Sequence, residues 1–209
     1  MVFDERYQHI RIVNNAAADG TARFENISTA TASLHALAAC NGGFFIRTPF
    51  DPFGLMICDG KSFGTYDRDS WMNGVIVVRE TGCMLETTQA FKLSPQIRDA
   101  LQSGPWLVRD GHSEPMLDQQ LLARRTFIAR SSRGMWALGS CSACTLQTLA
   151  ELLRDDAVTA KINIVQGLNL DGGPSTGLWA KNHPNDFYDP EGWAVRNFVA
   201  VFPNAPEAP

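Results

Sequence analysis

The sequence predicts a single α+β domain built mostly from antiparallel strands, and three observations support this. Short apolar and β-branched segments recur along the 209 residues, whereas only two segments have clear helical features. No strand–helix–strand repeat is present, which disfavours a parallel doubly wound sheet. No repeat or low-complexity linker divides the chain, whose length is typical of one domain. We therefore expect one domain over residues 1–202 and a frayed, proline-rich tail over 203–209.

The expected strands are short, and several of them end at a turn signal. Val75–Val78 is apolar and β-branched, as in a core strand. Trp106–Val108 precedes the turn dipeptide Asp110-Gly111. Two further segments are expected to form a hairpin around Arg133-Gly134. The remaining strands, with the two of the hairpin, are expected over 6–13, 55–59, 125–131, 135–140, 162–168 and 193–202.

Two helices are expected. The clearer one runs from Thr145 to Asp155 and places Leu146, Leu149, Leu152 and Leu153 on one face. The other begins with Ser94 as the N-cap and Pro95 at the first helical position, and it is expected to end near Gln102.

Charge and hydropathy exclude two classes of partner. The net charge is −4, which argues against a dedicated nucleic-acid-binding protein because phosphate neutralisation needs clustered Lys and Arg. No segment is apolar for long enough to span a bilayer. The first eight residues are polar and do not form a signal peptide, so we expect a cytoplasmic protein unless a leader has been removed, in which case it is exported or periplasmic. The oligomeric state stays open.

The five cysteines are an odd number, so at least one thiol is free, which fits a reducing compartment slightly better. Cys141 and Cys144 form the sole Cys-x-x-Cys motif, which supplies two of the four ligands of a structural zinc. We expect no zinc there because the other two ligands are missing. Buried structural thiols are the favoured interpretation, and redox activity of the pair stays open.

The stretch from Asn169 to Trp179 carries the most information about function. The apolar run 162–168 predicts a buried strand, and Asp171 follows where that strand should end. Gly172 and Gly173 then allow a positive φ or the close approach of a ligand. Ser175 and Thr176 add hydroxyl groups. A carboxylate, amides and hydroxyls at a rigid strand end are suited to holding a polar ligand, although Asp-Gly between apolar runs is also typical of a plain hairpin turn.

A second segment has the same organisation. Asn41, Gly42 and Gly43 follow the apolar run 34–39 and precede Phe44-Phe45. Asn41 can donate and accept hydrogen bonds at once, which suits sugar hydroxyls; capping the turn is the structural alternative. Two such segments make a shared site a better explanation than two unrelated turns.

Four ordered segments together resemble the phosphodiester glycosidase family. They lie between about Ala36 and Phe202, and each is short, but their order makes the resemblance specific. The segments are Asn41-Gly42-Gly43-Phe44-Phe45, Ser103-Gly104-Pro105-Trp106-Leu107-Val108, Arg125-Thr126 and Leu170-Asp171-Gly172-Gly173-Pro174-Ser175. The resemblance implies an enzyme that cleaves a sugar from a phosphodiester-linked partner, or acts on a related glycan, without indicating which sugar.

The resemblance also implies roles for individual residues. Asp171 is the expected catalytic carboxylate, assisted by Asn41. Arg125 would bind the phosphate, although a solvated arginine at a strand end is the alternative. The residues expected to bind substrate with it are Gly42, Gly43, Ser103, Gly104, Thr126, Gly172, Gly173, Ser175, Thr176 and Asn197. We expect these segments to converge on one cleft, with the glycine amides as anion donors.

Other features of the site stay open. A stable phosphate leaving group lessens the need for a second acid. If one exists, Asp51 and Asp110 are candidates because they lie near the four segments of the resemblance, although a turn residue is the favoured interpretation of Asp110. Trp106, Trp179 and Trp193 could stack on a sugar or belong to the core. The sequence predicts no particular cofactor, and Ca²⁺ or Mg²⁺ near Asp171 is compatible with its carboxylate.

Two other functions share these residues. A non-catalytic carbohydrate-binding module would use the same glycines and tryptophans without cleaving the sugar. A serine hydrolase would use Ser175 as nucleophile, but the Gly-x-Ser-x-Gly elbow is missing and none of the four histidines has a recognisable partner.

Overall fold

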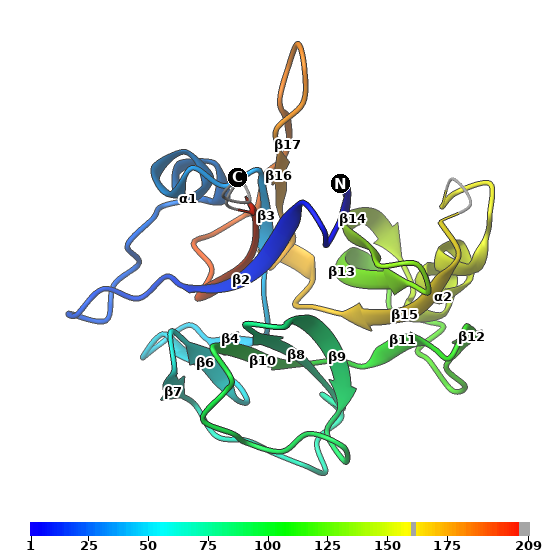
Figure 1. The fold of residues 1–209 in the computed structure, drawn as a ribbon, viewed down its shortest axis with the longest axis horizontal. Helices are drawn as coiled ribbons and strands as arrows, with labels where there is room; N and C mark the ends of the chain where they lie inside the picture. Colours follow the sequence, from blue (N-terminus) through cyan, green and yellow to red (C-terminus); the bar gives the residue numbers. More distant parts are fainter. Residues whose placement is uncertain (160–161, 205–209) are drawn as a thin grey trace, which may run out of the picture.

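Three large antiparallel sheets and one two-stranded pair make up the strands of the computed structural model, which describes residues 1–159 and 162–204 (Figure 1). Every strand pairing within these residues is antiparallel, as the sequence predicts. The first sheet has the order β1 (Val2–Asp4), β14 (Met135–Cys144), β13 (Ala123–Ser131), β15 (Ile164–Asn169), β11 (Trp106–Arg109) and β12 (His112–Ser113).

The second sheet has the order β7 (Lys61–Phe63), β6 (Met56–Cys58), β10 (Asp99–Ser103), β8 (Gly74–Arg79) and β9 (Gly82–Thr87). The third has the order β17 (Phe187–Asp189), β16 (Leu178–Ala180), β3 (Ala38–Asn41), β18 (Asn197–Pro203) and β2 (Gln8–Asn14). A small pair consists of β4 (Phe45–Ile46) and β5 (Asp51–Pro52). The helices are α1 (Ile27–Leu34), α2 (Leu146–Arg154) and the 3₁₀ turn η1 (Gly173–Ser175).

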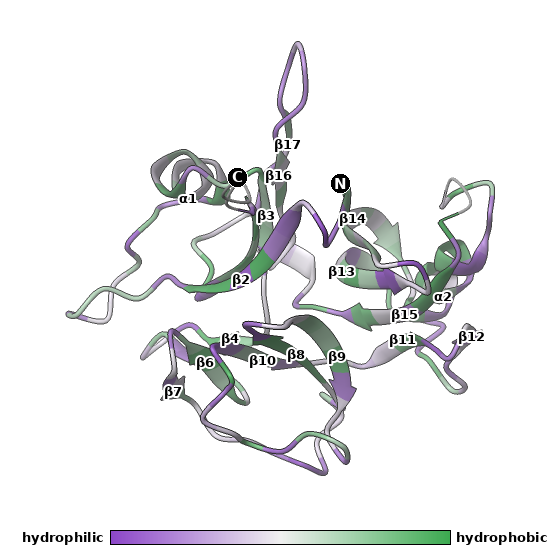
Figure 2. Ribbon diagram, in the orientation of Figure 1, coloured by the Kyte–Doolittle hydropathy of each residue, from purple (hydrophilic) through white to green (hydrophobic). Residues whose placement is uncertain are grey.

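A central core joins the three sheets. Ile10 of β2, Leu101 of β10 and Trp136 of β14 are buried in this one cluster. Figure 2 shows these sheets as largely hydrophobic, whereas the loop between β16 and β17, which projects from the body, is hydrophilic. Because each sheet contributes one face to the same apolar cluster, the sheets cannot separate without exposing it.

The outer faces of the sheets are covered by smaller clusters. The Leu-rich face of α2 packs on the first sheet through Leu149 and Leu153, as the helical pattern predicts. Helix α1 packs on the third sheet through Ile27. Phe91 and neighbouring loops cover the second sheet. No helix in the described residues combines the length and the apolar character needed to cross a bilayer.

A buried carboxylate ties the second sheet to the third. Asp99 of β10 has a fully buried side chain and accepts hydrogen bonds from Arg11 Nε (2.5 Å) and from the backbone N–H of Ile12 (3.3 Å), both in β2. It also accepts from the backbone N–H of Asp59 (2.9 Å). Several donors surround this carboxylate, so its burial is compensated.

The predicted helix over 94–102 is wrong. Ser94 does accept a local bond from Gln96 N–H, as a cap would, but residues 99–103 form the central strand β10. All five residues of β10 are buried, so the strand has no alternating pattern that would reveal it. Tertiary burial overrides the local capping signal here.

Helix α1 was not predicted from the sequence. Asn26 and Thr29 form a capping box at its start, which is a readable signal. The Ser- and Thr-rich composition of the helix has weak helix propensity and hides it. The last strand begins at Asn197 rather than 193 and extends to Pro203, which pairs with Gln8. The remainder of the predicted tail, 205–209, lies outside the described residues.

Candidate functional site

Asn41, at the end of β3, is the hub that joins the predicted segments. Its Nδ2 donates to the backbone carbonyl of Asp171 (2.7 Å) and contacts the carbonyl of Gly42 (3.5 Å). Its Oδ1 accepts from Thr126 Oγ1 (2.6 Å) and from Gly177 N–H (3.1 Å). The side chain is completely buried and its hydrogen-bonding positions are occupied, so it positions the Asp171 turn rather than offering an amide to a sugar.

Asp171 presents the carboxyl group of the site just beyond β15. Its backbone N–H donates to Gly42 O (3.0 Å), and its Oδ1 accepts from Gly172 N–H (2.8 Å). Burial raises the pKa of this carboxyl to about 6, against smaller, opposing effects of the Ser175 side chain and the Gly172 N–H. A carboxyl group with this pKa can exchange a proton near neutral pH, as acid–base catalysis requires.

The turn after Asp171 is fixed by its glycine and its serine. Gly173 has φ +60, a left-handed conformation that disfavours other residues. It starts η1, and Ser175 N–H then bonds to Gly172 O (3.2 Å). The Ser175 hydroxyl is buried and accepts from Trp193 Nε1 (3.0 Å). Ser175 therefore links the Asp171 carboxyl to Trp193.

The end of β10 forms another wall of the site. Ser103 Oγ donates to Asn169 O (2.9 Å), and Asn169 Nδ2 donates to Gly104 O (2.8 Å). Ser103 is completely buried. The Ser103–Gly104 segment thus holds the strand that leads into Asp171, as its predicted place near the site requires, but the Ser103 hydroxyl is committed to the protein.

Asn197 supports the Gly42–Gly43 segment from β18. Its backbone carbonyl accepts from Gly42 N–H (2.9 Å), and its Oδ1 accepts from Gly43 N–H (2.8 Å). A side chain at position 42 would collide with Asn197 Oδ1, so the close approach requires glycine. Both N–H groups, like that of Gly172, already have protein acceptors, so three of the four glycine amides of the predicted anion-binding nest are occupied within the protein.

Arg125 is also committed to the protein. Its Nε donates to Cys144 O (3.2 Å) and its Nη2 donates to Leu121 O (2.7 Å), and the residue is 8% exposed. Its Cδ lies 3.8 Å from the position of a Cβ at Gly172, so it does reach the turn. Thr126 is buried against Asn41. The role of Arg125 as the phosphate ligand stays a prediction. Its observed contacts are those of a residue that supports the turn after Asp171.

Three buried polar atoms around the site have no protein partner within the described part of the chain. They are Asn169 Oδ1, Thr176 Oγ1 and Asn197 Nδ2. Each belongs to a segment that the hydrogen bonds above connect to Asp171. Unpaired buried polar groups are costly, so the fold carries an energetic penalty in the segments around Asp171.

Three residues near the site have no role in the sequence-based prediction, namely Trp71, Arg47 and Glu191. Trp71 is 53% exposed and packs edge-on against Phe44, the residue after Gly43, with ring centroids 4.7 Å apart. The guanidinium of Arg47 lies over the Trp193 ring, 4.5 Å from its centroid. Glu191 accepts from the first backbone N–H of α1, that of Ile27 (2.5 Å), and burial raises the pKa of its carboxyl. Exposed Trp71 could have been suspected from its polar loop; the others depend on tertiary contacts.

Some predicted candidates lie elsewhere. Asp110 is exposed in the turn at the far end of β11, whose other end, at Trp106, pairs with Leu168. Asp51 is exposed on β5, and among the described residues no hydrogen bond or ion pair joins it to the site. Trp106 is 1% exposed and belongs to the core, and Trp179 packs in the cluster beneath α1. No second carboxyl group is therefore brought to Asp171 by these predictions.

The structure shows the surroundings of the cysteine pair and of the side chains that could bind a metal ion. Cys141 and Cys144 lie on the bulged end of β14 with their sulfur atoms 3.1 Å apart, and burial raises the pKa of the Cys144 thiol to about 12. Within 1–159 and 162–204, no three His, Cys, Asp or Glu side chains form a group that could hold a metal ion. Ca²⁺ or Mg²⁺ binding at Asp171 would need other oxygen ligands.

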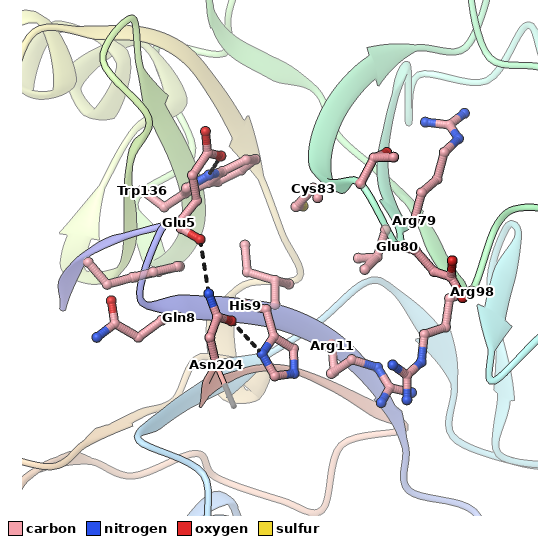
Figure 3. Close-up of a pocket in the computed structure, with 15 residues that line it drawn as sticks. Glu5, Gln8, His9, Arg11, Arg79, Glu80, Cys83, Arg98, Trp136 and Asn204 are labelled. Carbon is pink, nitrogen blue, oxygen red and sulfur yellow. Dashed lines mark hydrogen bonds between the residues drawn. The ribbon is translucent and has the colours of Figure 1, made fainter. Parts of the chain in front are cut away.

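A separate cavity lies at the opposite end of β18 from Asn197 (Figure 3). It has a volume of about 440 Å³ and is lined by Glu5, His9, Arg11, Arg98 and Trp136, among others. Its cations are largely paired: Arg11 contacts Asp99 and Asp59 (2.5 and 2.6 Å), and Arg98 approaches Asp59 (3.8 Å). This cavity is remote from the Asp171 turn.

Comparison of the sequence with models of known protein families identifies the class of protein to which these sheets and this carboxyl-bearing turn belong. The family model for phosphodiester glycosidase matches residues 35–202. The chain belongs to the phosphodiester glycosidase family. No curated protein matches the sequence significantly.

Solved structures share the fold at low identity. The catalytic domain of zebrafish N-acetylglucosamine-1-phosphodiester α-N-acetylglucosaminidase, auto-inhibited by its pro-peptide, is 19% identical with a TM-score of 0.66, over 93% of this chain and 73% of that one. A hypothetical protein from Synechocystis is 14% identical with a TM-score of 0.59, over 94% and 57%. A putative exported protein from Burkholderia pseudomallei is 12% identical with a TM-score of 0.59, over 97% and 73%.

Proposed function

We propose that this protein hydrolyses a glycosidic bond in a sugar phosphodiester or a related glycan, with Asp171 as the acid/base or nucleophilic carboxyl group. One observation carries the proposal: burial raises the pKa of Asp171 to about 6 at a turn that several distant segments hold in place. Membership of the phosphodiester glycosidase family supports the reaction class.

The geometry suggests how Asp171 would act. In its ionised form the carboxylate could attack the anomeric carbon or activate a water molecule. A phosphate leaves as a stable anion, so one carboxyl group can suffice when no second acid is present. Asn41 would contribute indirectly by holding the Asp171 backbone (2.7 Å).

The sugar would bind beside Gly43. Trp71 and Phe44 form an aromatic pair there, and Trp71 leaves about half its surface exposed. Aromatic faces suit the apolar faces of sugar rings. This pair also favours the second candidate function, a carbohydrate-binding module that does not cleave its ligand.

A serine hydrolase has no comparable support. Ser175 is 2% exposed, and its hydroxyl accepts a hydrogen bond from Trp193 Nε1. Among the hydrogen bonds of the described residues, none joins this hydroxyl to a histidine. A nucleophilic serine needs an adjacent base.

The test is turnover on a panel of sugar phosphodiesters and aryl glycosides. We expect Asp171→Asn to lower kcat/KM at least about a hundredfold, as the loss of a group acting on developing charge does. Asp110→Asn is the matched control: it changes an exposed carboxyl in a remote turn and should leave turnover unchanged. Circular dichroism checks the fold of each variant.

The outcomes separate the candidate functions. Near-normal activity in folded Asp171→Asn would remove Asp171 from the mechanism. Sugar binding by the unmutated protein without any cleavage would favour the binding module. Inactivation by serine-directed reagents, lost in Ser175→Ala, would favour the hydrolase.

A further inference from the structure

Four arginines lie near the site, and they differ in what their guanidinium groups contact. Arg124 donates to Asp189 Oδ1 (2.5 Å) and to a backbone carbonyl. Arg125 donates to two backbone carbonyls. Arg196 is buried against Asn14, and burial lowers its pKa. Arg124 and Arg125 are therefore used by the protein itself, and Arg196 is only 3% exposed, so that an anion in solvent does not reach it.

Arg47 is different because it is exposed, whereas Arg125 and Arg196 are buried. It lies in the loop between β4 and β5, and within the described residues it takes part in no ion pair. Its guanidinium is instead held over the ring of Trp193 at 4.5 Å. A guanidinium stacked in this way uses its flat face, so the N–H donors around its edge stay available to an anion.

A continuous set of contacts leads from Arg47 to the carboxyl group of the site. Arg47 stacks on Trp193, and Trp193 Nε1 donates to Ser175 Oγ (3.0 Å). The Ser175 side chain in turn hydrogen-bonds with the Asp171 carboxyl and lowers its pKa, against the larger effect of burial. The backbone adds a further tie, because Gly192 N–H donates to Pro174 O (2.7 Å). Trp193 therefore sets Arg47 at a fixed place beside the Asp171 turn.

We infer that Arg47, held on Trp193, binds the anionic phosphate of the substrate beside Asp171. The inference rests on the proposed function and deepens it: the ligand is a singly charged phosphodiester, with its phosphate toward Arg47 and its sugar toward Phe44 and Trp71. Arg125, the residue expected from the sequence, shapes the turn instead. Pre-organisation by Trp193 lowers the entropic cost of binding through a long side chain.

Inorganic phosphate is the probe, and the indole N–H signals in ¹H–¹⁵N NMR spectra are the reporters. Trp193 reports on the Asp171 site, and its signal is assigned with Trp193→Phe. Trp136, whose Nε1 donates to Glu5 (2.8 Å), reports on the separate cavity of Figure 3. Phosphate should shift the Trp193 signal and leave that of Trp136 in place.

The variants test the residue directly. Arg47→Ala should weaken phosphate binding roughly tenfold to a hundredfold, the usual value of charge-assisted hydrogen bonds, and Arg47→Lys should restore part of it. Arg23→Ala is the matched control, because Arg23 is an exposed arginine stacked on a different ring, that of Phe24 (5.1 Å), away from the Asp171 turn. It should bind phosphate normally.

The same variants, assayed for turnover, should show a raised KM in Arg47→Ala with a smaller change in kcat. Phosphate binding that is unchanged in Arg47→Ala, or that shifts Trp136 instead of Trp193, would overturn the inference. Arg47-dependent phosphate binding in a protein that cleaves no sugar phosphodiester would retain the anion site and reject the proposed reaction. Normal cleavage with a normal KM in Arg47→Ala would retain the reaction and reject the anion site.

Discussion

The burial of Asp171 affects both its proposed catalytic role and the pH dependence of the protein's stability. Its carboxyl group has a pKa of about 6 in the folded protein, above the ordinary 3.8. A carboxyl with a raised pKa favours the folded state most when it is protonated. Its contribution to stability is therefore fully present below about pH 3.8 and is lost as the pH rises through about 6.

This linkage gives a prediction for Asp171→Asn. The variant keeps an oxygen for the Gly172 N–H but cannot ionise, so its Tm should exceed that of the unmutated protein at pH 8, by a few degrees. The difference should vanish near pH 4. Thermal unfolding followed by circular dichroism across this range measures it. An equal Tm at both pH values would mean that the carboxyl is not desolvated.

Ser175 offers a test of the same ionisation through activity. Its side chain lowers the pKa of Asp171, so Ser175→Ala should move the midpoint of the pH–activity profile to higher pH. The direction is the same whether Asp171 acts as a base or as an acid. The profile of kcat/KM shows the shift, and Asp110→Asn should leave the midpoint in place. A midpoint at lower pH would contradict the contact.

At this scale the sequence predicts some site residues and not others. Asp171, Asn41 and Gly42 could be placed because each lies where an apolar run gives way to a glycine pair. The role of Asn41 could not be predicted, because three of its side-chain hydrogen bonds join it to segments far away in the chain, at Asp171, Thr126 and Gly177. Arg47 carries no local signal, and Trp193 could be named only as a ring able to stack on a sugar, since the pairing of the two exists only after the loops have packed.

Among the elements, the short 3₁₀ turn η1 depends on one glycine. Gly173→Ala keeps open space around the new methyl group but strains the backbone at φ +60, and it should cost about 1–2 kcal/mol of unfolding free energy. Gly20→Ala is the matched control, with φ +81 and equally open surroundings in a loop outside the site. Denaturant unfolding should show similar losses, while turnover should fall only in Gly173→Ala. Equal turnover in both would mean that the turn geometry is not needed for activity.

Elements with a strong internal pattern were predictable. Helix α2 has a Leu-rich face, and β8 is a β-branched run, so both were located from the sequence. Strand β10 and helix α1 were not. Burial on both faces removes the alternation from β10, and α1 is stabilised by packing on the third sheet rather than by propensity.

For the whole molecule, the Arg11–Asp99 pair is a test of how the sheets are joined. Arg11→Met leaves the buried Asp99 carboxylate without its guanidinium partner and should cost about 3–5 kcal/mol. Adding Asp99→Asn removes the charge, so the double variant should lose less than the sum of the single variants. Denaturant unfolding of the four proteins gives the coupling. Additive losses would mean that the two side chains do not interact.

The same long-range ties determine when the site can form during folding. Asn41 reaches across 130 residues to Asp171, and Gly43 reaches across 154 to Asn197. Contacts at such separation form slowly because the intervening chain must first be ordered. An unfolded chain returned to native conditions should therefore recover activity only in its last kinetic phase, so enzyme activity would report the arrival of the complete native state rather than of any single sheet.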